Sequence, residues 1–76
     1  MTIKYFGMVA EVTKKQEETI TTGVSSIGQL LQVLSDNYPE LDNIHFKLAV
    51  DHNIVDNNFI LNGNEEIALL PPFAGG

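Results

Sequence analysis

The feature that most restricts the fold is a run of apolar residues with helical spacing near the middle of a short chain. These side chains recur three and four residues apart, on one face of an α-helix: Ile27, Leu30, Leu31, Leu34 and Tyr38. Ser26 and Gln29 fit a capping box, in which Ser26 accepts from the N3 amide and Gln29 reaches back. Pro39 disfavours helical geometry at the residue before it. We therefore predict one helix between Ser26 and Pro39, with Gly28 allowing it to pack closely on a sheet.

Segments with alternating or β-branched residues surround this helix and predict strands. They are residues 2–6, 17–22, 46–50, 54–55 and 66–70. The first two strands could pair antiparallel through a connection, residues 8–15, that has room for one helical turn. A single helix laid across a mixed sheet is the economical way to bury these apolar stripes. The sequence thus predicts an α+β fold, a β-grasp (ubiquitin-like) roll over residues 1–70 with an extended C-terminal tail, residues 71–76.

Composition excludes several classes of function. The 76 residues contain no Cys, so disulfides, thiolate metal sites and cysteine nucleophiles are ruled out. The net charge of −6, with four Lys and no Arg, argues against nucleic acid as a partner. No segment has the ~18 apolar residues of a membrane span, and the first residues alternate like a strand where a signal peptide would be apolar. His45 and His52 have no partner at metal-ligand spacing. We expect a cytoplasmic protein that binds no cofactor or metal and contacts no membrane.

The end of the chain carries the strongest functional signal. Leu70-Pro71-Pro72-Phe73-Ala74-Gly75-Gly76 leaves the last predicted strand, and the two prolines stiffen its exit. Six extended residues reach about 20 Å, enough to enter the active site of a neighbouring protein. Without side chains at the last two positions, the terminal carboxylate is open to chemistry. Frayed terminal glycines are common, but a stiffened stalk before them favours a functional tail.

These residues resemble the MoaD family of the MoaD/ThiS sulfur carriers, which share the β-grasp fold of ubiquitin. The resemblance spans essentially the whole chain. Its most specific part is Glu66-Ile67-Ala68-Leu69-Leu70-Pro71-Pro72-Phe73-Ala74-Gly75-Gly76, similar to the family's E-[VI]-A-x-x-P-P-x-x-G-G ending. The opening Ile3-Lys4-Tyr5-Phe6 and the Leu48-Ala49-Val50 strand are also similar. The Pro-Pro pair favours the molybdopterin branch over the thiazole-forming ThiS branch.

The resemblance implies a mechanism without an active site in this chain. An E1-like (MoeB-like) adenylyltransferase would use ATP to activate Gly76 as an acyl-adenylate, and a sulfur donor protein would convert it to a thiocarboxylate. The tail, residues 71–76, would then enter the large subunit of molybdopterin synthase (MoaE-like) and give sulfur to cyclic pyranopterin monophosphate. Two alternatives stay open: a ubiquitin-like modifier joined to lysines through Gly76, and a carrier for thiazole synthesis.

Side-chain alternation predicts where the large subunit docks. Ile3 and Tyr5 should face the helix, as should Ile67 and Leu69. Phe6 and Leu70 would then be large apolar residues on the outer face, at the root of the tail, and Phe73 would anchor along it. Burying one such side chain gives roughly 1.5–3 kcal/mol, so its loss should weaken docking about tenfold or more.

Overall fold

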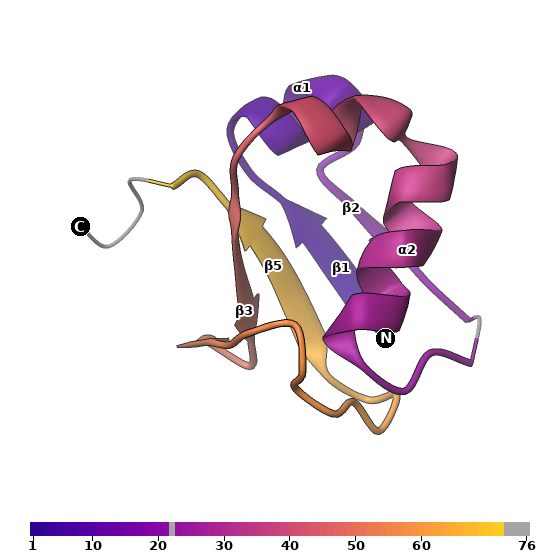
Figure 1. The fold of residues 1–76 in the computed structure, drawn as a ribbon. Helices are drawn as coiled ribbons and strands as arrows, with labels where there is room; N and C mark the ends of the chain where they lie inside the picture. Colours follow the sequence, from indigo (N-terminus) through magenta and orange to yellow (C-terminus); the bar gives the residue numbers. More distant parts are fainter. Residues whose placement is uncertain (22, 73–76) are drawn as a thin grey trace.

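The computed structural model describes residues 1–21 and 23–72, in which one helix lies across one face of a five-stranded mixed sheet (Figure 1). The elements follow in the order β1 (Thr2–Tyr5), α1 (Met8–Thr13), β2 (Glu17–Thr19), α2 (Ile27–Asn37), a 3₁₀ helix η1 (Pro39–Asn43), β3 (Lys47–Val50), β4 (Asn53–Ile54) and β5 (Glu66–Leu70). This is the predicted ubiquitin-like arrangement, with two short helical segments added at one end of the sheet.

The sheet brings the two ends of the chain together at its centre. Its strand order is β2-β1-β5-β3-β4. β1 pairs in parallel with β5, with Ile3 opposite Ile67, and antiparallel with β2. β3 pairs antiparallel with both β5 and β4. The strand that leads into the C-terminal tail is therefore held on both sides.

α2 forms where the periodicity predicts it and ends one residue earlier. Ile27, Leu30 and Leu34 are fully buried, whereas Leu31 and Tyr38 at the margins of the apolar stripe are half-buried. The Ser26 hydroxyl accepts from the Gln29 amide at 3.2 Å, as predicted.

Two details of the predicted helix start were wrong or incomplete. The Gln29 side chain accepts from the amide and hydroxyl of Ser25, one residue before the cap. Gly28 does not face the sheet: it is exposed, and its amide donates to the Asn57 carbonyl oxygen at 3.1 Å. A loop, and not the sheet, approaches this glycine.

The core lies between α2 and the inner face of the sheet. Ile3, Tyr5, Ile67 and Leu69 are at most 2% exposed, which confirms the predicted inward faces of β1 and β5. The same cluster includes Leu48 and Val50 of β3, Leu41 of η1 and Val9 of α1. The connection 8–15 is more ordered than expected, because it forms α1 and buries Val9.

The predicted strands lie in the right places with different bounds. β1 and β3 each lose one expected terminal residue, and β4 begins one residue earlier than residues 54–55. β2 pairs only up to Thr19; beyond it Ile20 is buried in the core, and Thr22 lies outside the described residues. Between β3 and β4, Asp51 and His52 both adopt positive φ, which suits a two-residue hairpin turn.

Candidate functional site

The root of the C-terminal tail is fixed by the two neighbours of β5. The Phe6 amide donates to the Leu69 carbonyl oxygen at 3.1 Å, and Leu70 lies opposite Lys47 of β3. Pro71 follows at once, half-buried, and Pro72 is exposed. The chain thus leaves the sheet from its central strand, at the end of the sheet where β1 and β5 terminate (Figure 1).

The structure brings Phe6 and Leu70 together on the outer face of the sheet, as the alternation predicts. They line one shallow depression of about 290 Å³ with residues of β1, β3, β5 and the β3–β4 hairpin: Lys4, Ala49, His52, Ile54, Glu66 and Ala68. Phe6 is 43% exposed and Leu70 is half-buried. We call this surface the outer-face patch.

Ile54 is the largest contributor to this patch that the sequence did not reveal. It is 61% exposed, more than Phe6, and it lies opposite Ala49 across the β3–β4 hairpin. Directly opposed residues in an antiparallel pair share a face of the sheet. The hairpin register, once known, therefore places Ile54 beside Ala49 on the outer face.

Charged and polar side chains border the patch on one side. Lys4 Nζ lies 3.1 Å from Glu66 Oε1, and His52 Nε2 lies 3.8 Å from Glu66 Oε2. All three side chains are substantially exposed, so the pairs contribute little to stability. Their place beside an apolar surface suits the polar rim of a protein interface.

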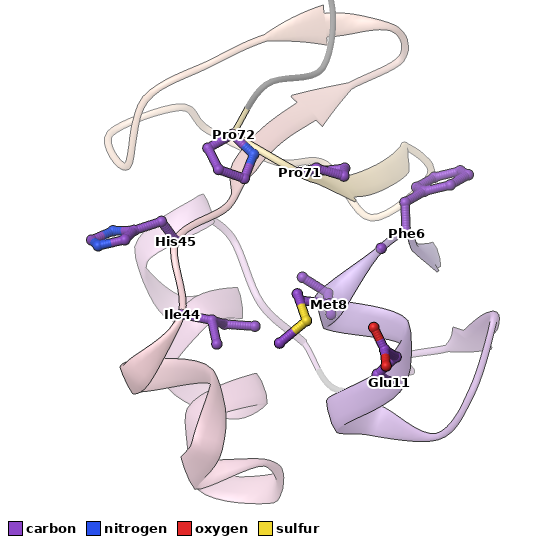
Figure 2. Close-up of a pocket in the computed structure, with 9 residues that line it drawn as sticks. Phe6, Met8, Glu11, Ile44, His45, Pro71 and Pro72 are labelled. Carbon is purple, nitrogen blue, oxygen red and sulfur yellow. The ribbon is translucent and has the colours of Figure 1, made fainter.

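A second apolar surface flanks the tail root on the other side of Phe6. A groove of about 500 Å³ runs between the start of α1, residues 44–45 and the two prolines. Figure 2 shows Met8 and Ile44 pointing toward one another across it, with Pro71 and Pro72 above and the His45 ring turned outward. Met8 is 56% exposed. The prolines thus leave the sheet between two apolar surfaces, only one of which the sequence predicted.

The predicted tail residues Phe73, Ala74, Gly75 and Gly76 lie outside the described residues. Of the site predicted from the sequence, the structure therefore locates Phe6, Leu70, Pro71 and Pro72. These four residues are neighbours at the exit of β5, as Figure 2 shows for Phe6 and the two prolines.

Polar side chains away from the tail root have structural roles. The Tyr38 hydroxyl donates to Glu18 Oε2 at 2.6 Å, and Lys15 Nζ lies 3.5 Å from the same oxygen. Partial burial works to raise the pKa of Glu18, but the Tyr38 hydroxyl and the Lys15 charge outweigh it, and the pKa falls below its usual range. These contacts join β2 to the end of α2.

Glu65 organises the turn that leads into β5. Its carboxylate accepts from the amides of Asn62 at 2.7 Å and Gly63 at 3.0 Å. Burial works to raise the pKa of this carboxyl, but the backbone donors outweigh it and lower the pKa. An ionised, hydrogen-bonded Glu65 is therefore part of the folded structure and not a proton donor.

The described part of the chain holds neither a cluster of metal ligands nor a membrane-spanning helix. Within residues 1–21 and 23–72, no three His, Asp or Glu side chains gather closely enough to hold a metal ion. No helix in the same ranges has the length and apolarity that crossing a bilayer requires.

The fold and the tail root together define a class: small ubiquitin-like β-grasp domains whose central strand continues directly into a C-terminal tail. The ThiS family matches residues 3–76, nearly the whole chain. The molybdopterin synthase sulfur carrier subunit of Mycobacterium tuberculosis is 30% identical over 79 aligned positions, covering 97% of this chain and 94% of that protein. The chain belongs to the ThiS family, which confirms the resemblance to the MoaD/ThiS carriers.

Solved structures agree with the fold. SAMP1 of Haloferax volcanii superposes with a TM-score of 0.80 at 23% identity, over 100% of this chain and 98% of that one. A protein of Pyrococcus furiosus assigned as subunit 1 of the molybdopterin converting factor gives a TM-score of 0.80 at 16% identity, over 93% and 94%. At these identities the likeness establishes the ubiquitin-like fold and nothing finer.

Proposed function

We propose that this protein is the sulfur-carrier small subunit of molybdopterin synthase. The observation that carries the proposal is the near full-length identity of 30% to a protein of that name. The ending Pro71-Pro72-Phe73-Ala74-Gly75-Gly76 supports it, because it follows directly from the last residue of β5. A carrier needs a rigid body that a partner can recognise and a chain end that the partner can use.

The chemistry starts at the carboxylate of Gly76. A free carboxylate resists nucleophiles, so an E1-like adenylyltransferase first joins it to the α-phosphate of ATP and releases pyrophosphate. Adenylate is a good leaving group, and sulfide (HS⁻) delivered by a donor protein attacks the carbonyl carbon and displaces it as AMP. The product is a thiocarboxylate at Gly76. The sulfur is then covalently bonded to the terminal carbonyl carbon, which explains how a chain with no Cys can carry sulfur.

The tail next enters the large subunit, which supplies the acid–base groups and binds cyclic pyranopterin monophosphate. The sulfur leaves for that substrate, and hydrolysis returns Gly76 to a carboxylate. A dithiolene contains two sulfur atoms, so each molybdopterin consumes two loaded termini. The outer-face patch, with Phe6, Ile54 and Leu70, is the docking surface in this proposal, because it borders the tail root and remains exposed in the isolated chain.

Reconstitution tests the proposal. Thiocarboxylated protein, the large subunit and cyclic pyranopterin monophosphate should together yield molybdopterin, with the carrier recovered as free chain. The same protein lacking Gly76 is the control, and it should fold normally and yield no product. Failure of the loaded wild-type chain to convert the precursor would exclude this role.

Two further experiments separate the carrier from the two alternatives. A protein modifier would accumulate in cells as isopeptide conjugates that disappear when Gly76 is removed. A thiazole carrier would donate sulfur to the thiazole-forming enzyme and leave the pterin precursor unchanged. Either result would replace the proposed function.

A further inference from the structure

Gly7 has a conformation and a neighbour that the fold alone does not demand. It follows β1 and precedes α1, with φ 59° and ψ −132°. Residues with a Cβ avoid this region, so the position favours glycine. The neighbour is Pro71, 64 positions later in the sequence and the first residue beyond β5.

The contact between them is close enough to depend on the missing side chain. A Cβ built on Gly7 would lie 2.8 Å from Cγ of Pro71, 3.7 Å from its Cβ and 3.8 Å from its Cδ. Carbon atoms in contact prefer about 3.5–4.0 Å, so a side chain here would push the ring away. The three nearest atoms all belong to Pro71. Gly7 thus forms a notch that is shaped by the ring of Pro71.

The notch lies where the tail begins, so it can control the path that the tail takes. The Phe6 amide makes the last hydrogen bond between the β1 segment and β5, to Leu69, and Gly7 is the next residue along. Pro71 is likewise the first residue after β5. The proline ring is bonded to its own backbone, so seating the ring fixes where the main chain goes next.

We propose that Gly7 is a positioning residue for the C-terminal tail: it seats the Pro71 ring and thereby sets the direction in which the tail leaves the sheet. The inference rests on the proposed function for its purpose, since a chain end that must enter another active site gains from a fixed starting direction. It rests on the geometry alone for the contact itself.

The competing explanation is stiffness. If Pro71 and Pro72 act only by restricting their own φ angles, each should matter equally. If Gly7 seats the ring, Pro71 should matter far more. Pro71→Ala and Pro72→Ala are therefore a matched pair, since both remove one proline beyond the last strand.

The first measurement reports direction without reference to sulfur. Because the natural chain has no Cys, spin labels can be attached to cysteines introduced at Asn58 and Ala74. Pulsed electron–electron double resonance then gives the distribution of distances between the label on the tail and the label on the folded domain. We expect Pro71→Ala to broaden or shift this distribution and Pro72→Ala to change it much less. Equal changes from the two variants, or no change from Pro71→Ala, would overturn the inference.

The second measurement connects direction to function. With loaded carrier as the varied substrate of the large subunit, Pro71→Ala should lower kcat by about tenfold to a hundredfold, since a misplacement of about 1 Å can cost ~100-fold. KM should change little, because the outer-face patch is intact. Pro72→Ala should lower kcat much less.

Gly7→Ala completes the test, because its effect should depend on whether the Pro71 ring is present. Its effect on kcat should be smaller in the Pro71→Ala background than in the natural chain, because the atom it clashes with is gone. An equal effect in both backgrounds would contradict the contact. If the wild type transfers no sulfur at all, the proposed function fails, while the spin-label distances still decide the inference.

Discussion

Replacing Ile54 by Ala should weaken docking on the large subunit and leave the fold almost intact. Fully burying an isoleucine side chain gives about 1.5–3 kcal/mol. Since 61% of Ile54 is exposed, about 0.9–1.8 kcal/mol of this remains to be gained in a complex. The dissociation constant should therefore rise about fivefold to twentyfold. The part already buried limits the loss of folding stability to about 0.6–1.2 kcal/mol.

The same reasoning revises the expected effect at Phe6. Complete burial on docking would give a tenfold loss or more, but only 43% of Phe6 is exposed in the free chain. About 0.6–1.3 kcal/mol is then available, so Phe6→Ala should weaken docking about threefold to ninefold. Ile54 should consequently be the more sensitive position, although the sequence pointed to Phe6.

Isothermal titration calorimetry with the large subunit measures these changes, and Ile60→Ala supplies the control. Ile60 is 72% exposed but lines a different depression, with Phe59 and Asn62. Its truncation should cost similar stability and leave affinity unchanged. If Ile60→Ala weakened docking as much as Ile54→Ala, or if Ile54→Ala left affinity unchanged, the outer-face patch would not be the docking surface.

Three further predictions concern stability. Gly28→Ala should raise the free energy of unfolding by up to about 1 kcal/mol, because Ala favours the helix more than Gly does. The new Cβ would lie at an ordinary 3.5 Å from the Asn57 oxygen, so no clash opposes this gain, and urea unfolding measures it. Ser26→Ala should cost about 0.5–2 kcal/mol in the same assay, by removing the cap of α2. The lowered pKa values of Glu18 and Glu65 mean that their contribution is complete above the unfolded value of about 4.3 and is lost as pH falls through the folded values. At pH values below about 4.3 the melting temperature should therefore decrease as the pH falls, and this decrease should be less steep in Glu65→Gln than in the natural chain. An equal slope of melting temperature against pH in the two proteins would contradict this.

The parts of the fold that the sequence predicted are those set by local periodicity. The α2 stripe has one buried face, and β5 alternates in and out over its whole length. Ser26, Pro39 and Pro71 mark element ends through backbone chemistry that acts within a few residues. These signals depend on near neighbours in the sequence, so they survive without knowledge of the fold.

The features that escaped prediction depend on contacts between distant segments. Gly28 faces the loop at Asn57, and η1 forms where Leu41 is buried against the core. β2 is short because its register with β1 ends at Thr19, although the buried Ile20 still exchanges backbone hydrogen bonds with Met1. No local pattern specifies which distant segment will lie opposite a given residue.

The residues of the candidate site also fall into those that a local pattern predicted and those that depend on contacts between distant segments. Alternation along single strands predicted that Phe6 and Leu70 share the outer face, because only the pleat matters there. Ile54, Met8 and Ile44 were missed because their exposure depends on the hairpin register and on how α1 meets residues 44–45. The contact between Gly7 and Pro71 requires the parallel pairing of β1 with β5, which joins the two ends of the chain.

The most direct test of the sulfur-carrier proposal is the intact mass of the chain after incubation with ATP, an E1-like adenylyltransferase and a sulfur donor. The proposal predicts a mass increase equal to the replacement of one oxygen by one sulfur, localised to Gly76. Deleting Gly76, or appending one residue after it, should abolish the increase while the circular dichroism spectrum stays unchanged. Normal sulfur loading of an extended chain that stays uncleaved would contradict the role assigned to the terminal carboxylate.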